Sequence, residues 1–86
     1  MKFMVEGTPA QTITADIMAL APAETARGQE LDAQGLRTAL YLAADYAKVW
    51  QTFVADTQEE VQRALESLPL YHVTTYTIIP LAPDQP

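Results

Sequence analysis

The chain has 86 residues and a formal net charge of −6, from 11 acidic and 5 basic side chains. So short a chain has one core, and we treat residues 1–86 as a single domain. The basic residues are scattered along the sequence, which argues against nucleic acid as a partner. The sequence contains no cysteine, which excludes disulfides and thiolate metal sites.

Small size makes self-association the expected source of extra stability. A monomer of this length hides only about 60–70% of the surface that its unfolded chain exposes, so association usually supplements the core. No run approaches the ~18 apolar residues that cross a bilayer, and the first residues show no signal-peptide pattern. The sequence therefore predicts a cytoplasmic protein with no membrane partner.

A strand and a long helical segment are predicted for the first part of the chain. Residues 2–7 read as a short strand with apolar side chains on both faces. Residues 15–34 carry apolar side chains near helical spacing, with Thr12 or Thr14 as the N-cap and Gly35 as the stop.

Pro22 interrupts this helical segment. Proline lacks the backbone N–H and crowds the carbonyl group four residues earlier. It predicts either a kink near Met18 or a short helix followed by a second helix from Ala21.

Two further strands are predicted at residues 36–42 and 48–54, because β-branched and aromatic side chains are frequent there. Residues 43–47 form a plausible hairpin connection, although their alanines are also compatible with a helical extension.

A second helix and a last strand complete the predicted pattern. Thr57 and Glu60 form a capping box, and Pro69 ends the helix, whose buried stripe is formed by Val61, Ala64, Leu65 and Leu68. Residues 71–79 are the strongest predicted strand, and residues 80–86 are expected to form an extended C-terminal tail.

The order β-α-β-β-α-β is typical of the ferredoxin-like α+β fold with a four-stranded antiparallel sheet. Helices cover one face of such a sheet and leave the other face open. We expect a second subunit to pack on the open face. Phe3, Tyr41, Phe53 and Tyr76 line this sheet, but the sequence does not determine which face each of these rings takes.

The C-terminal half resembles that of the muconolactone isomerases and their relatives. The resemblance lies in residues 64–71, which contain the turn Leu68-Pro69-Leu70, and in the β-rich run that follows. A second similarity is an acidic residue, Glu24, eleven positions before Gly35. The resemblance implies a dimeric α+β barrel, in which two sheets pack face to face, and self-association as a dimer or a larger ring. It also implies cofactor-independent proton transfer within an unsaturated lactone.

The resemblance also implies roles for individual residues. Glu24 matches the acidic helix position, as the general base, and Arg37 matches an arginine on the following strand after a one-residue gap. The alternative for Glu24 is an acid that stabilises a helix N-terminus by ~0.3–1 kcal/mol. Arg37 either anchors a substrate carboxylate or pairs with a neighbouring acid such as Glu30 or Asp32.

His72 and the aromatic residues are the remaining candidates. His72, the single histidine, is a candidate acid or base or else a structural strand-start residue. Tyr41, Trp50 and Tyr71 are candidate substrate-binding residues that line an apolar pocket and donate a hydrogen bond. Alternatively, these rings fill the core and the dimer interface. One histidine and no cysteine leave no expected metal site.

The leading hypothesis is a cofactor-independent isomerase-like enzyme that moves a proton in a small unsaturated lactone or related cyclic carbonyl compound. The alternative is a non-catalytic module of the same fold for small-molecule binding or oligomerisation, with an exposed Glu24 and a filled cleft. A third class on this fold, haem-degrading or oxygenating enzymes, needs a haem-ligating or quinol-activating set of residues, for which the chain offers only one histidine.

Overall fold

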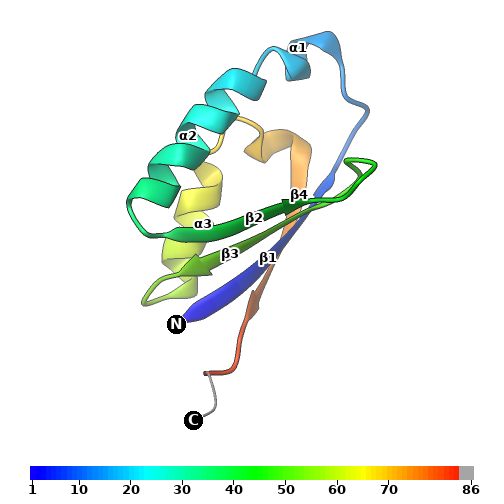
Figure 1. The fold of residues 1–86 in the computed structure, drawn as a ribbon. Coiled ribbons are helices and arrows are strands. Elements are labelled where there is room, and N and C mark those ends of the chain that lie inside the picture. The colour runs from blue at the N-terminus through cyan, green and yellow to red at the C-terminus, as the bar shows by residue number, and fades with distance from the viewer. Residues whose placement is uncertain (84–86) are drawn as a thin grey trace.

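The computed structural model describes residues 1–83 and shows the helices gathered over one face of a four-stranded sheet (Figure 1). The strands are β1 (Lys2–Pro9), β2 (Arg37–Leu42), β3 (Val49–Val54) and β4 (Thr74–Pro80). They form one antiparallel sheet in the order β2-β3-β1-β4. The helices are α1 (Ala15–Met18), α2 (Ala21–Ala33), α3 (Gln58–Glu66) and the 3₁₀ turn η1 (Tyr71–Val73). The predicted ferredoxin-like α+β pattern is confirmed.

Pro22 splits the first helical segment in two, which is the second of the two predicted outcomes. The short helix α1 is capped by Thr14, whose side-chain oxygen accepts from the backbone N–H of Ile17 at 3.3 Å. Pro22 then lies in the first turn of α2. Backbone N–H groups in the first turn have no acceptor within the helix, so the N–H that proline lacks costs no hydrogen bond. The predicted stop is also confirmed, because Gly35 ends the segment with φ +77°.

The second half follows the prediction up to the last strand. Thr57 caps α3, accepting from the backbone N–H of Glu60 at 3.3 Å. The last strand begins at Thr74 instead of Tyr71. The turn after Pro69 continues as η1, in which the N–H of Tyr71 donates to the carbonyl of Leu68 at 3.0 Å. The tail was predicted as residues 80–86, of which 84–86 lie outside the described residues.

The core lies between the helices and the sheet, and it assigns the aromatic side chains whose faces the sequence leaves open. Phe3 and Phe53 are opposite each other on β1 and β3 and are fully buried under the helices. Tyr76 also lies on the helix side. Only Tyr41 of these four residues lies on the open face, where it is 61% exposed. The strand register was needed to assign these faces, because a shift of one residue inverts them.

The open face nevertheless carries large apolar side chains. Val54 and Ile79 are 43% and 44% exposed, and alternation along β1 and β3 places Met4 and Trp50 on the same side. No helix among the described residues is long and apolar enough to cross a membrane.

Candidate functional site

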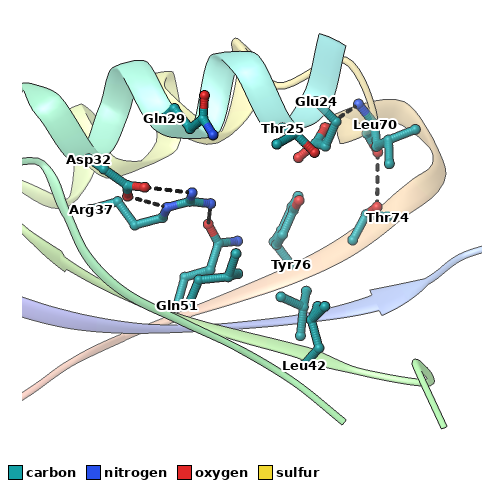
Figure 2. A pocket seen from close by; sticks show the side chains of 12 residues that line it. Glu24, Thr25, Gln29, Asp32, Arg37, Leu42, Gln51, Leu70, Thr74 and Tyr76 are labelled. Carbon is teal, nitrogen blue, oxygen red and sulfur yellow. Dashed lines mark hydrogen bonds and ion pairs between the residues drawn. The ribbon is translucent and has the colours of Figure 1, made fainter. Parts of the chain in front are cut away.

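A cavity of about 460 Å³ lies between α2 and the sheet (Figure 2). Its floor is formed by strands β2, β3 and β4, its roof by α2, and one end by the turn that precedes η1. The wall combines polar side chains, four aliphatic side chains and one tyrosine, and it consists of Glu24, Thr25, Gln29, Asp32, Arg37, Leu40, Leu42, Val49, Gln51, Leu70, Thr74 and Tyr76. A cavity of this size accommodates a small organic molecule.

Glu24 enters the cavity from the first turn of α2 and is half-buried. Its Oε1 accepts a hydrogen bond of 2.8 Å from the backbone N–H of Leu70, in the turn after α3. Burial raises the pKa of the Glu24 carboxyl, and this effect outweighs the opposing effects of the Leu70 hydrogen bond and the Arg37 charge. The carboxyl group therefore takes up a proton more readily than an exposed glutamate.

Tyr76 faces Glu24 from the sheet. Its phenol points from β4 toward the Glu24 carboxyl (Figure 2), and burial together with that carboxylate raises the pKa of Tyr76 to about 12. Gly7 lies opposite Tyr76 on β1, and a Cβ atom there would come within 2.8 Å of the ring. The missing side chain lets the ring lie close to the strand, and the phenol stays protonated, as a donor, at neutral pH.

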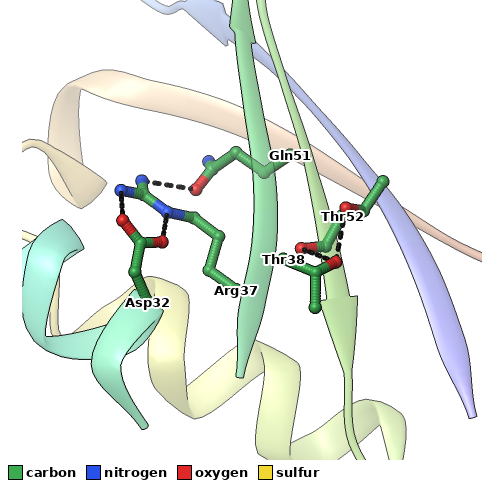
Figure 3. Close-up of polar contacts among 5 residues, drawn as sticks. All are labelled: Asp32, Arg37, Thr38, Gln51 and Thr52. Carbon is green, nitrogen blue, oxygen red and sulfur yellow. Dashed lines mark hydrogen bonds and ion pairs between the residues drawn. The ribbon is translucent and has the colours of Figure 1, made fainter. Parts of the chain in front are cut away.

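Arg37 lies at the other end of the cavity and is buried, with 9% of its surface exposed. Its Nε and Nη2 donate to the two carboxylate oxygens of Asp32 at 2.7 and 3.1 Å, and its Nη1 donates to Gln51 at 3.3 Å (Figure 3). The hydrogen bonds from Arg37 lower the pKa of Asp32. Pairing with Asp32 is one of the alternatives predicted for Arg37 from the sequence. The burial of the arginine was not part of that prediction.

Gly28 makes room for this guanidinium group. It lies in the middle of α2, and a Cβ atom there would approach the Arg37 Nη2 to 2.6 Å and Cζ to 3.0 Å. Glycine inside a helix costs about 1 kcal/mol relative to alanine. The close approach of Arg37 to the helix backbone is the physical reason for glycine at this position.

A β-bulge in β2 decides which of its side chains line the cavity. Arg37 is opposite Phe53, but Ala39 is opposite Thr52, so one extra residue is inserted between them. Thr38 turns to the other side of the sheet, where its hydroxyl lies 2.7 Å from that of Thr52 (Figure 3). Beyond the bulge the even-numbered side chains face the helices. Leu40 and Leu42 therefore line the cavity together with Arg37.

The structure brings two of the six candidate residues to the cavity, Glu24 and Arg37. The bulge turns Tyr41 to the open face, and Trp50 lies opposite it on β3, between two cavity-lining residues. Tyr71 packs against the core, and its hydroxyl accepts from Gln62 at 2.9 Å. His72 is exposed, with its ring edge-on to Tyr71 at 5.5 Å between centroids. None of these four residues lines the cavity of its own chain.

Several lining residues were missed by reasoning from sequence. The phenol that faces the cavity belongs to Tyr76, not to Tyr41. Thr25, Gln29 and Asp32 also line it, at i, i+4 and i+7 on α2. Polar residues at this spacing form one helix face, a signal that α2 faces a cavity as well as the core. Among residues 1–83, no group of three or more histidine, cysteine or acidic side chains is placed to hold a metal ion.

The fold and the site together define a ferredoxin-like α+β protein with a carboxyl-bearing cavity between its first long helix and its sheet. The sequence matches the muconolactone delta-isomerase family over residues 1–85, so the chain belongs to that family. No curated protein matches the sequence.

A solved structure of muconolactone isomerase has the same fold as this chain. A crystal structure of muconolactone isomerase superposes with a TM-score of 0.83 at 22% identity, covering 98% of this chain and 91% of that one. Protein Atu4242 from Agrobacterium tumefaciens gives a TM-score of 0.49 at 12% identity over 95% of this chain and 94% of its own. The first match supports the ferredoxin-like fold, and the second is too distant to carry an argument.

The Gly28→Ala substitution is expected to displace the Arg37 guanidinium group, because the new methyl group would occupy its place. Asp32 would then lose its hydrogen bonds from Arg37, and its lowered pKa should rise toward the ordinary value of 3.8. An NMR titration of the Asp32 carboxyl measures this change. The control Ala26→Gly alters the same helix at an exposed position and should leave the pKa unchanged. An unchanged pKa in Gly28→Ala would contradict the proposed packing.

Proposed function

We propose that the protein is a cofactor-independent isomerase that moves a proton within a small unsaturated lactone or related cyclic carbonyl compound, in the cytoplasm. The observation that carries this proposal is the Glu24 carboxyl, with its raised pKa, at a cavity that also presents the Tyr76 phenol. A base with a pKa nearer neutrality and a neutral donor opposite it are the two groups that proton transfer next to a carbonyl requires. Membership of the muconolactone delta-isomerase family supports the same chemistry.

The proposed reaction has two proton transfers. The ionised Glu24 takes a proton from a saturated carbon atom next to the unsaturated carbonyl system, and the C–H electron pair enters that π system to give a dienolate. Tyr76 donates a hydrogen bond to the developing oxyanion, and its high pKa keeps its own proton in place. Glu24, now protonated, returns the proton to a different carbon of the allylic system. The double bond moves, and no atom is gained or lost.

In this proposal Arg37 is a positioning residue. Its guanidinium is held by Asp32 and Gln51, and its charge favours the ionised form of Glu24. His72, Tyr41, Trp50 and Tyr71 have no part in this reaction within one chain, because they lie away from the cavity.

A non-catalytic small-molecule-binding module is the second candidate, and one observation favours it. The hydrogen bond from Leu70 gives Glu24 a structural purpose, because it ties α2 to the turn after α3. A binding module needs the cavity but no titrating group inside it. The two candidates therefore differ in whether the Glu24 proton matters to turnover.

The Glu24→Gln substitution separates these candidates. Glutamine keeps an oxygen that accepts from the Leu70 N–H but cannot act as a base, so turnover of a panel of enol-lactones should fall by about 10²–10⁴-fold. The matched control is Glu30→Gln, on the same helix, where Glu30 pairs with Arg27 at the surface. It should retain the wild-type rate. Equal rates for wild type and Glu24→Gln would remove Glu24 from the chemistry and favour the binding module.

The pH dependence tests the raised pKa of Glu24. Because the ionised carboxylate is the base, kcat/KM should fall about tenfold per pH unit on the acid side of a pKa above 4.5.

The raised pKa of Glu24 also predicts how folding stability changes with pH, and the direction is opposite to that of kcat/KM: stability should fall as the pH rises. The folded chain holds the Glu24 proton more tightly than the unfolded chain, so ionisation destabilises it as the pH rises above 4.5. Denaturant unfolding of Glu24→Gln should lack that loss, and a difference from wild type that stays constant with pH would contradict it.

We also propose that two copies associate through the open face of the sheet, on which the large apolar side chains are Met4, Tyr41, Trp50, Val54 and Ile79. Large apolar side chains on a face that no helix covers are typical of a protein interface. Such packing would complete the dimeric α+β barrel that the family resemblance implies.

Light scattering at micromolar concentration should therefore give a mass of at least two chains of 9.5 kDa. Tyr41→Glu should lower this mass, because it places a charge in the proposed interface. Gln58→Glu makes the same charge change at the exposed start of α3 and should not lower it. A wild-type monomer would overturn the proposal.

A further inference from the structure

Gln51 is a buried polar side chain of the cavity wall to which the proposed reaction gives no chemical role. It lies on β3, and only 3% of its surface is exposed. The residues two positions before and after it on β3, Val49 and Phe53, are apolar. A buried primary amide is costly unless hydrogen bonds satisfy it. The choice of glutamine at this position therefore depends on the groups that its amide contacts.

Arg37 fixes the direction in which the Gln51 amide points. Its Nη1 lies 3.3 Å from the oxygen of the Gln51 side chain. A guanidinium group has only donors, so the carbonyl oxygen must face it and the amino group, Nε2, must point away. Figure 2 shows this nitrogen turned into the cavity, on the side of Tyr76. Asp32 holds the guanidinium group through two hydrogen bonds, and the amide cannot flip without losing its contact with Arg37.

Tyr76 reaches the same part of the cavity from the other side of β1. Gly7, on β1, is opposite Val49 of β3 and Tyr76 of β4. A Cβ atom at Gly7 would lie 2.7 Å from Val49 Cγ1 and 2.8 Å from Tyr76 Cε1, so these two side chains meet over the glycine. The Tyr76 ring thus leans across β1 toward β3, the strand that carries Gln51.

The amide and the phenol are hydrogen-bonded to each other. Burial and then the Glu24 charge raise the pKa of Tyr76, and a hydrogen bond with the Gln51 side chain is among the contacts that oppose this rise. A contact that lowers the pKa of a phenol donates to its oxygen, so Nε2 uses one of its two N–H groups on Tyr76. The second N–H group of Gln51 and the O–H group of Tyr76 can then donate to one oxygen atom of a ligand.

We propose that Gln51 is a further catalytic residue, whose Nε2 group forms a donor pair with the Tyr76 hydroxyl at the oxyanion of the dienolate. This inference rests on the proposed function, because the oxyanion arises in that reaction. Donors that are in place before the charge develops stabilise an oxyanion more than a carbonyl oxygen, since hydrogen bonds to charged acceptors are stronger. Arg37 acts through Gln51, because it keeps the amide from presenting its own oxygen to the oxyanion.

Binding of an oxyanion analogue tests the donor pair without turnover. The probe is tetronate, the enolate of a five-membered lactone, which is ionised at pH 7, and the reference ligand is the uncharged butenolide. Both are titrated by NMR into the assembled Glu24→Gln protein, because this substitution reproduces the uncharged side chain that Glu24 has in the intermediate. Tetronate should bind about tenfold more tightly than butenolide. Weaker binding of tetronate, or none at millimolar concentration, would overturn the proposal.

Gln51→Met, made in the same Glu24→Gln protein, removes the donor and keeps the length of the side chain. Because the lost hydrogen bond is made to a charged oxygen, tetronate binding should weaken about tenfold or more, and butenolide binding at most about threefold. Gln34→Met is the matched control at the exposed end of α2 and should change neither dissociation constant. An equal loss for both ligands would overturn the role of Gln51.

A measurement with Gln51 intact covers the case that Gln51→Met fails to fold. Saturation of the Glu24→Gln protein with tetronate should move a side-chain amide proton of Gln51 downfield, as a new hydrogen bond to an anion does. The side-chain amide of the exposed Gln34 should not move. Gln51 amide signals that stay unchanged at saturation would contradict the donor pair.

Turnover distinguishes this inference from the proposed function. With Glu24 intact, Gln51→Met should lower kcat on the enol-lactone panel about 10²-fold with little change in KM, because the hydrogen bond strengthens in the transition state. Tetronate binding that depends on Gln51, in a protein that isomerises no lactone, would contradict the proposed enzyme and support the donor pair. Isomerisation with an unchanged kcat in Gln51→Met would support the enzyme and contradict the donor pair.

Discussion

The ion pair between the buried Arg37 and the half-exposed Asp32 is the contact on which the site depends. A buried guanidinium group is stable only when its donors are satisfied, and here Asp32 and Gln51 accept three of its hydrogen bonds. These contacts join the last part of α2 to β2 and β3. They hold the helix against the sheet through polar groups, in place of the large aliphatic side chains that usually fill such a space.

The other end of α2 is held in a similar way. The Glu24 carboxylate accepts from the backbone of Leu70 and so ties the first turn of the helix to the turn after α3. Leu31 is the fully buried side chain that α2 adds to the core. With polar attachments near both ends, the helix covers the sheet without filling all of the space beneath it, and the cavity remains. The Glu24 carboxylate therefore attaches the helix and also faces the cavity. This is why both a structural and a catalytic role could be considered for Glu24 from the sequence.

The elements that sequence reasoning predicted well are those with local causes. Pro22 fixes the break between α1 and α2, Gly35 ends the second of them, and Thr57 begins α3. Each effect acts within one or two turns of the chain, so it can be read from neighbouring residues. Glu24 and Arg37 were identified through the family resemblance, and the structure places both at the cavity.

The faces of the strands could not be predicted in this way. Whether Tyr41 or Leu40 faces the helices depends on the bulge after Arg37, which is a property of the pairing between β2 and β3. The face of Tyr76 was likewise not predictable, because only its register opposite Gly7 shows where its ring lies. Long-range pairing leaves little trace in the residues of a single strand.

The bulge at Thr38 fixes both faces of β2 at once. Because the strand carries one residue more than β3 between Arg37 and Ala39, Leu40 and Leu42 follow Arg37 onto the helix side. If the same residues paired without the bulge, Ala39 and Tyr41 would lie beneath α2 and the two leucines would lie outside. One inserted residue therefore sets the aliphatic lining of the cavity and also places a tyrosine on the opposite face of the sheet. In this small fold, ligand preference and subunit contact share a single local cause and can diverge together during evolution.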